Sequence, residues 1–250
     1  MRDAFPDSSG RPHAGLPGVD LAGTVVVQLA DRAPTKAGDH RLLVGLVSRL
    51  TGVDAGAITL DQVCPSCGKT GHGPLRVVVG GTVRTARAVH VSLARAGGRL
   101  ALAVTAAGPV GVDLESVVAL RRAPVADVLL SGAEARALAA LDPPAAAAAV
   151  AAVWTAKEAV LKAAGVGLRV DPRDLTIAPA GAGAPATGRS GRRDADQVAS
   201  RPVLAGWPAA PFPLDQMHLL PLAASAGTVG TVAVVCAAPP VLALLPVQAG

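Results

Sequence analysis

Two short stretches of this chain place ionised side chains among residues that are otherwise almost entirely apolar. The first is Gly111-Val112-Asp113-Leu114-Glu115, and the second runs from Trp154 to Gly165 with the sequence WTAKEAVLKAAG. Hydrophobic residues make up 51% of the chain and charged residues only 16%. Three carboxylates and two lysines with so few polar neighbours need a physical reason, because charges in apolar surroundings must be paired or must bind an ion. A metal together with a phosphate-bearing ligand supplies that reason.

The first stretch is predicted to lie on a strand that begins near Val110, after the turn signal Gly108-Pro109. Side chains on a strand alternate between its two faces, so Asp113 and Glu115 share one face and lie roughly 6–7 Å apart. Unpaired carboxylates so close raise each other's pKa, and a divalent cation between them removes this penalty. Ligands that offer only oxygen favour a hard ion such as Mg²⁺. The alternative is a solvated strand face with two ordinary acids.

The second stretch is predicted to lie on a helix that ends at Gly165. Lys157 points into the middle of its apolar arc, while Glu158 and Lys162 lie along the edge at i, i+4, in the favourable order. The chain has four lysines against nineteen arginines, and two of the four lysines are in this helix. A snorkelling lysine beside a surface ion pair is the alternative. Arginine is far more common in this chain and would serve equally well for solubility. The presence of two lysines in this helix therefore favours a functional site.

The pair of motifs, G-V-D-L-E followed by W-T-x-K-E-x-x-x-K-x-x-G, resembles the signature of the 4′-phosphopantetheinyl transferases, specifically the larger, monomeric, surfactin-synthetase-activating type. Enzymes of this family move the phosphopantetheine arm of coenzyme A to a serine of an apo acyl or peptidyl carrier protein and release adenosine 3′,5′-bisphosphate. By this resemblance Asp113, Glu115 and Glu158 bind Mg²⁺. Lys157 and Lys162 contact the pyrophosphate. Glu158 is also a base for the carrier serine, and Lys162 stabilises the leaving group.

The same resemblance implies contacts to the 3′-phosphate of coenzyme A. Ala94-Arg95-Ala96-Gly97 falls where the family usually has a Ser-His-Ser/Ala-Gly turn, so Arg95 stands at the position of the phosphate-binding histidine. An arginine fork can bind a phosphate in the same way. The alternative is an exposed arginine in a hairpin turn. Arg41 and Arg49, on an expected helix at Asp39–Thr51, are further candidates and are equally compatible with a solvated surface.

A cysteine-containing segment, Cys64-Pro65-Ser66-Cys67-Gly68 followed by His72-Gly73-Pro74, has residues that bind metals. It offers three ligands, whereas a structural zinc site needs four. Relatives carry a similar loop against the adenosine of coenzyme A, which implies that His72 and Gly73 contact the cofactor. Pro74 stands where the family has a basic residue.

The order of strand-like and helical runs predicts an α+β fold. By the resemblance, the fold has two similar α/β halves related by a pseudo-twofold, each a small, mainly antiparallel sheet packed with helices, with the ligand site between them. Strands are expected at 24–30, 75–80, 88–93, 99–105, 110–117, 174–178, 217–222 and 228–237, and helices at 39–51, 133–141 and 145–164. We expect the chain to divide into an N-terminal half at 21–107 and a C-terminal half at 108–237, the second with a flexible insertion at 180–201. A poorly ordered N-terminus at 1–20 precedes them, and a tail at 238–250 follows.

The formal charge of +5 suits a protein that handles a polyanionic cofactor and an acidic carrier protein. Nucleic acid is not an expected partner, because aromatic residues for base stacking are only 2% of the chain. We expect a cytoplasmic monomer without a membrane-spanning run or a signal peptide, and the three cysteines agree with a reducing compartment. Two alternatives stay open: a catalytically impaired relative that binds coenzyme A, and a basic binding module without enzymatic activity.

Overall fold

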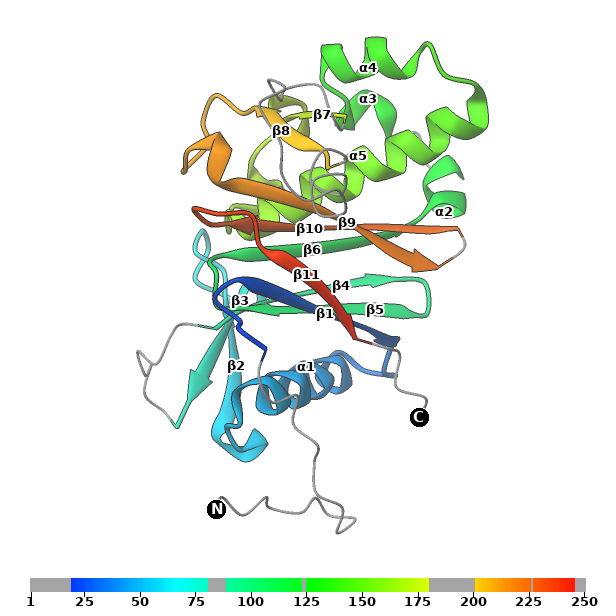
Figure 1. The fold of residues 1–250 in the computed structure, drawn as a ribbon. Helices are drawn as coiled ribbons and strands as arrows, with labels where there is room; N and C mark the ends of the chain where they lie inside the picture. The colour runs from blue at the N-terminus through cyan, green and yellow to red at the C-terminus, as the bar shows by residue number, and fades with distance from the viewer. Residues whose placement is uncertain (1–18, 81–88, 123–124, 180–200, 226, 246–250) are drawn as a thin grey trace, which may run out of the picture.

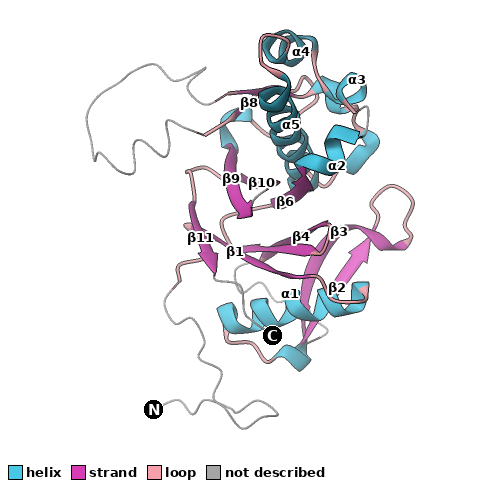
Figure 2. Cartoon of the chain, turned by 90° about the vertical axis from the view of Figure 1, so that its right-hand side faces the viewer, coloured by secondary structure: helices cyan, strands magenta, loops and turns pink. Residues whose placement is uncertain are grey.

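The protein is built from two β-sheets stacked face to face, each covered on its outer side by a long helix (Figure 1). The structure, a computed structural model, describes residues 19–80, 89–122, 125–179, 201–225 and 227–245. The expected N-terminus at 1–20 and the insertion at 180–201 therefore lie almost wholly outside the described residues. Figure 2 shows the same stack from the side, with α1 (Lys36–Thr51) below and α5 (Pro143–Ala163) above.

The lower sheet has six strands in the order β11-β1-β5-β4-β3-β2. Its pairs are antiparallel except for β1 and β11, which run parallel. The strands are β1 (Thr24–Asp31), β2 (Ile58–Val63), β3 (Thr70–Val79), β4 (His90–Ala96), β5 (Arg99–Thr105) and β11 (Val241–Leu245). Helix α1 is capped by Thr35, stops at the left-handed Gly52 (φ 70°) and buries Leu43, Leu46 and Val47 against this sheet.

The upper sheet has three strands in the order β6-β10-β9 and is antiparallel throughout. Its strands are β6 (Val110–Ser116), β9 (Met217–Ser225) and β10 (Thr228–Val235), and a separate two-stranded sheet joins β7 (Thr176–Ala178) to β8 (Val203–Gly206). Short helices precede α5, at α2 (Val117–Arg122), α3 (Ala126–Leu129) and α4 (Gly132–Leu138). Single-turn 3-10 helices lie at Ala55–Ala57, Gly167–Arg169, Pro172–Asp174 and Leu214–Gln216.

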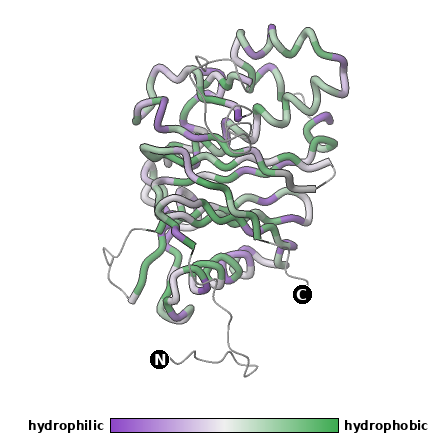
Figure 3. The backbone as a smooth tube through the Cα atoms, in the orientation of Figure 1, coloured by the Kyte–Doolittle hydropathy of each residue, from purple (hydrophilic) through white to green (hydrophobic). Residues whose placement is uncertain are grey.

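Small apolar side chains fill the space between the two sheets. Val25, Ala94 and Ala103 from the lower sheet pack against Val112 and Leu114 from the upper one, and all five are at most 3% exposed. The apolar strands of both sheets are visible in the middle of Figure 3. One polar contact crosses this seam, because Ser92 Oγ on β4 accepts a hydrogen bond of 3.0 Å from Val112 N on β6. The sheets thus form one continuous core.

Helix α5 covers the outer face of the upper sheet. Its N-cap is Asp142, whose side chain accepts from Ala145 N, and the left-handed Gly165 (φ 69°) follows shortly after its last residue, Ala163. By length and composition it is the one described helix that would be able to cross a membrane, so the expectation that no run reaches that length was wrong. In this fold its C-terminal part packs on β6 and β10 as a core helix, with Ala156, Ala159, Val160 and Leu161 at most 1% exposed.

The α+β fold expected from the sequence is confirmed, with mainly antiparallel sheets and a few helices. The pseudo-twofold relation of the halves stays a prediction. Strands β2, β8 and β11 were not expected, because they are short or carry polar residues at inward positions. A tail was expected at 238–250, but Val241–Leu245 forms strand β11 within it. This strand pairs with β1 and brings the C-terminal part of the chain back to the N-terminal half.

Candidate active site

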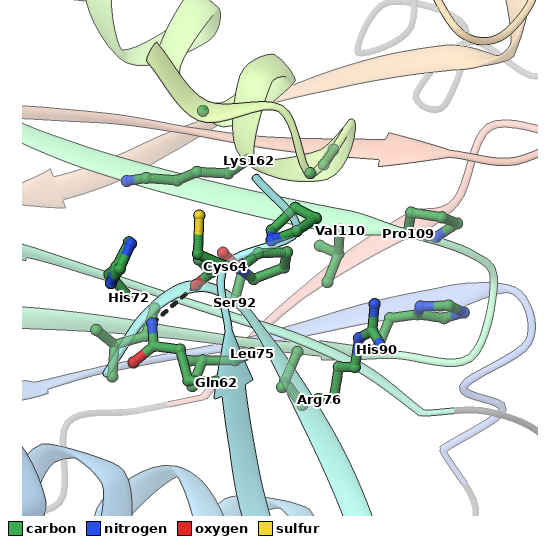
Figure 4. A pocket seen from close by; sticks show the side chains of 18 of the residues that line it. Gln62, Cys64, His72, Leu75, Arg76, His90, Ser92, Pro109, Val110 and Lys162 are labelled. Carbon is green, nitrogen blue, oxygen red and sulfur yellow. Dashed lines mark hydrogen bonds between the residues drawn. The ribbon is translucent and has the colours of Figure 1, made fainter. Parts of the chain in front are cut away.

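A cleft of about 1050 Å³ opens between the two halves. Strands β3 and β4, the start of α1 and the loop between β2 and β3 line one side, and the last turn of α5 with the start of β6 lines the other. In Figure 4, Lys162 on α5 lies above Cys64 of that loop and His72 at the start of β3. Among the described residues that line the cleft, Glu158 is the one carboxylate, whereas the lysines and arginines are Lys36, Arg76, Arg95, Lys162 and Arg169. This charge balance favours an anionic ligand.

Asp113 lies beside Lys162, where β6 crosses the last turns of α5. Its Oδ1 accepts a hydrogen bond of 2.6 Å from Lys162 Nζ, which also donates to Val112 O at 3.2 Å. Its Oδ2 is buried and has no hydrogen-bond partner. Burial raises the pKa of Asp113 even though Lys162 opposes the shift. An oxygen that is both buried and unpaired is a position where a cation would be stabilised.

Glu115 and Glu158 belong to the same electrostatic group. Burial raises the pKa of Glu115, and the charge of Asp113 raises it further, while the Trp154 side chain hydrogen-bonds to the carboxylate. Burial also raises the pKa of Glu158, with the charges of Asp113 and Glu115 adding to the shift and Lys162 opposing it. The structure therefore brings the three acids predicted from the sequence into mutual interaction around Lys162.

The three acids do not form the tightest group of potential ligands. Among the described residues, the one group of His, Cys, Asp or Glu whose ligand atoms all lie within 4.8 Å of one another is Cys64, Cys67 and His72. Like charges repel, so carboxylates without a cation between them are expected to stay apart. In this arrangement the Lys162 ammonium supplies the positive charge next to Asp113.

Other residues of the two motifs hold β6 and α5 together. A Cβ at Gly111 would lie 2.0 Å from Ala159 O, so only glycine allows the strand to approach the helix this closely. Behind Asp113, the hydroxyls of Thr155 on α5 and Thr231 on β10 are 3.1 Å apart. These contacts fix the position of Asp113 relative to Lys162.

Lys157 does not reach the cleft, which corrects the expectation that it contacts a pyrophosphate. Its side chain is 1% exposed, and Nζ donates to Glu134 Oε2 at 2.6 Å and to Leu129 O at 2.8 Å. Glu134 also accepts from Ile177 N and, in a capping box at the start of α4, from Ser131 N. Lys157 therefore joins α5 to α3, α4 and β7 inside the C-terminal half.

Arg95 lines the cleft and is held by a buried acid. Its Nε donates to Asp39 Oδ2 at 2.6 Å, whereas its Nη2 is buried without a hydrogen-bond partner. Burial alone would raise the pKa of Asp39, but the hydrogen bonds from Arg95 and from Ala33 N outweigh it and lower the pKa. The Arg95 guanidinium is thus oriented by Asp39 and keeps one nitrogen for another partner.

Arg41 is exposed and does not line the cleft, so its expected role is not supported by its position. Lys36 and His40 of the same helix do line it. The sequence placed the start of this helix at Asp39, three residues late, and therefore missed Lys36 in its first turn. His90 and Arg169 also line the cleft and were missed, because the start of β4 and a single-turn 3-10 helix give no periodic signal for them. Arg76, a candidate to replace the missing basic residue after Gly73, lines the cleft as well.

His72 and Gly73 line the cleft as expected, but the reason for the glycine differs. Gly73 has φ 97°, and a Cβ there would lie 2.8 Å from Cys64 Cα. Its close backbone approach is therefore to Cys64 and not to a ligand. Hydrogen bonds to the backbone of Cys67 and Ser66 lower the pKa of Cys64 to about 7. The Cys64 thiol therefore ionises more readily than that of an ordinary cysteine.

Comparison with known proteins gives one match, and it covers the residues on the α5 side of the cleft. No curated protein matches the chain. Residues 109–210 match the model of the 4′-phosphopantetheinyl transferase superfamily. The match includes Asp113, Glu115, Glu158 and Lys162, whereas the wall formed by α1, β3 and β4 lies before it. The segment from 109 to 210 is thus similar to the 4′-phosphopantetheinyl transferase superfamily.

Proposed function

We propose that this protein transfers the 4′-phosphopantetheine arm of coenzyme A to a serine of an apo acyl or peptidyl carrier protein, in a magnesium-dependent reaction that releases adenosine 3′,5′-bisphosphate. The superfamily match at residues 109–210 supports the type of reaction. The size and basic lining of the cleft support a large polyanionic ligand. Because one chain supplies both walls, the larger, monomeric, surfactin-synthetase-activating type of enzyme is the proposed subtype.

The acids around Lys162 have the chemistry that a magnesium ion requires. Asp113 offers a buried oxygen without a partner, and Glu115 and Glu158 add carboxylates whose pKa values are raised in the absence of a cation. Hard oxygen donors of this kind suit Mg²⁺, which keeps several waters and shares phosphate oxygens with its substrate. We assign Asp113 and Glu158 as ligands and Glu115 as a ligand that acts through water. When bound, Mg²⁺ supplies charge neutralisation at the pyrophosphate.

Residues of the chain then position the reacting groups. The oxygen of the carrier serine forms a bond to the phosphorus next to the pantetheine, and the bond from that phosphorus to the bridging oxygen breaks. Glu158 takes the serine proton, a role that suits a carboxylate whose pKa is raised by burial. Lys162 lines the cleft and stabilises the negative charge on the departing adenosine bisphosphate. On the opposite wall, Arg95 Nη2 binds the 3′-phosphate.

The observation that carries this proposal is the group formed by Asp113, Lys162 and Glu158 at the edge of a basic cleft. It is tested by incubating the protein with an apo carrier protein, coenzyme A and Mg²⁺ and weighing the carrier by mass spectrometry. We expect the carrier to gain the mass of one phosphopantetheine arm. In the isosteric variant Asp113→Asn, we expect the rate to fall by at least about 100-fold.

Other outcomes separate the alternatives. Binding of coenzyme A without mass gain on carriers from fatty-acid, polyketide and peptide synthesis would identify an impaired relative. Absence of coenzyme A binding would identify a basic binding module. Near-normal transfer by Asp113→Asn would show that the assignment of the metal ligands is wrong.

A further inference from the structure

The loop between β2 and β3, together with the start of β3, gathers three soft metal ligands at one point. Cys67 Sγ and His72 Nε2 are 3.2 Å apart, and Cys64 Sγ lies within 4.8 Å of both. The thiols of Cys64 and Cys67 are free, so no disulfide occupies the position. Nothing in the proposed transfer reaction uses these thiols.

The backbone of the loop holds the ligands in this arrangement. Cys64 N donates to Lys69 O at 3.0 Å and Gly68 N donates to Cys64 O at 2.9 Å, which closes a tight turn around the two cysteines. Gly68 has φ 69°, a conformation that only glycine adopts without strain. Gly73, packed against the backbone of Cys64, brings the neighbouring His72 back to the turn. The backbone hydrogen bonds and the two glycines therefore hold the three ligands close together before any ion binds.

From this geometry we infer that Cys64, Cys67 and His72 bind a zinc ion at the rim of the cleft. Two thiolates and an imidazole are soft or borderline donors that favour zinc over magnesium, in contrast to the oxygen donors around Asp113. The charge of the ion also balances the two thiolates.

The fourth coordination position is expected to hold solvent. No fourth His, Cys, Asp or Glu joins the group in the part of the chain that the structure describes. All three ligands, with Pro65 and Ser66 between them, line the cleft, so the open position is accessible from it. A site with three protein ligands and one open position matches the pattern of accessible zinc centres. The ion would brace the wall of the cleft next to Pro74, which lies against the last turn of α5 near Gly165.

The inference does not depend on the transferase reaction, and its test needs no activity. Full-length protein without an affinity tag is reduced, freed of metal and titrated anaerobically with Co²⁺, a spectroscopic substitute for zinc. We expect a thiolate-to-cobalt charge-transfer band and the strong visible bands of four-coordinate cobalt, saturating at about one ion per chain. Zinc should displace the cobalt and abolish both signals.

Variants identify the ligands. Cys64→Ser and Cys67→Ser should each weaken cobalt binding by at least about tenfold and reduce the charge-transfer band. His72→Gln should keep the charge-transfer band and change the visible bands. The matched control is Cys236→Ser, because Cys236 lies outside the group and hydrogen-bonds to Ala238 O. Asp113→Asn is the control for the acid site, and both controls should leave the titration unchanged.

The inference would be overturned by the absence of a charge-transfer band at stoichiometric cobalt, or by an equal loss in Cys236→Ser. Retained binding in both Cys64→Ser and Cys67→Ser would overturn it as well. Cys67 and His72 are exposed, so the substitutions are not expected to unfold the protein, and circular dichroism checks this. If a cysteine variant fails to fold, the spectrum of His72→Gln decides. An unchanged visible spectrum there would exclude the imidazole as a ligand.

Discussion

Lys157 and Lys162 lie on the same helix, yet their ammonium groups have different surroundings. Lys157 is enclosed and pairs with Glu134, whereas Lys162 is 32% exposed in its side chain and faces both Asp113 and the cleft. Burial lowers the pKa of Lys157 in spite of Glu134. One lysine thus contributes to the fold, and the other is available for chemistry.

Substitution of each lysine by methionine should separate these roles. Lys157→Met leaves the Glu134 carboxylate buried without its cation and should lower the free energy of unfolding by about 3–5 kcal/mol. Lys162→Met should change it less, because the Lys162 side chain is 32% exposed whereas that of Lys157 is 1% exposed, and it should reduce transfer by at least about 100-fold. Thermal denaturation and the carrier mass assay measure the two effects. Equal losses of stability would contradict the distinction.

Arg95 should recognise the 3′-phosphate of coenzyme A. Arg95→Ala should raise the Kd for coenzyme A by at least about tenfold, since a hydrogen bond to a charged group contributes roughly 1.5–3 kcal/mol. Binding of the 3′-dephospho analogue should be much less affected. Isothermal titration compares the two ligands, and Arg41→Ala is the matched control because Arg41 is outside the cleft. Similar losses for both ligands would mean that Arg95 does not touch that phosphate.

The acids predict how magnesium and pH act on stability. The pKa values of Asp113, Glu115 and Glu158 are raised on folding, so their contribution to stability is present below the ordinary values of 3.8 and 4.5 and is lost as the pH rises through the raised ones. Because Mg²⁺ binds the ionised forms, its stabilisation should grow as the pH rises above about 4 and passes through the raised pKa values of the acids. Thermal denaturation with and without Mg²⁺ measures this. A magnesium effect that is independent of pH, or that persists in Asp113→Asn, would contradict the assignment.

At the scale of the elements, the contact between β6 and α5 determines whether the site forms. Gly111→Ala should be strongly destabilising, by more than about 2 kcal/mol, because its Cβ would collide with Ala159 O and Ala163 N. Gly45→Ala in α1 is the matched control, since a Cβ there meets nothing within 4 Å and glycine is a poor helix former. The control should be stabilised by up to about 1 kcal/mol. Urea unfolding compares them, and equal stability would show that β6 can shift on α5.

At the scale of the whole molecule, β11 returns the end of the chain to the N-terminal sheet. It pairs with β1. Leu242 packs into the core between the two sheets, and Leu245 packs into the core between α1 and the lower sheet. A chain that ends at Pro240 should lose at least about 2 kcal/mol of stability from this ladder and its side chains. A chain that ends at Leu245 is the control and should keep the stability of the full protein. Guanidinium unfolding checks both, and an unchanged midpoint for the shorter chain would contradict the role of β11.

The sequence by itself was sufficient for the local structure. Apolar and helical patterns located β1, β5, β6, β10, α1 and α5, because each of these elements buries apolar side chains on at least one face. The same patterns predicted that Asp113 and Glu115 share a face and that Glu158 and Lys162 share an edge. The resemblance of the two motifs then added the superfamily that the match at 109–210 supports.

Contacts between distant parts of the chain were decided only by the tertiary structure. The partner of Lys157 is Glu134, the partner of Arg95 is Asp39, and β11 pairs with β1, and no periodicity in the sequence indicates any of these contacts. They depend on how the sheets stack and on which side chains the packing leaves facing the cleft. For the same reason the sequence included Lys157 and Arg41 among the ligand contacts and missed Lys36. Local periodicity determines which face of an element is buried, whereas the packing of the elements determines which residues that face contacts.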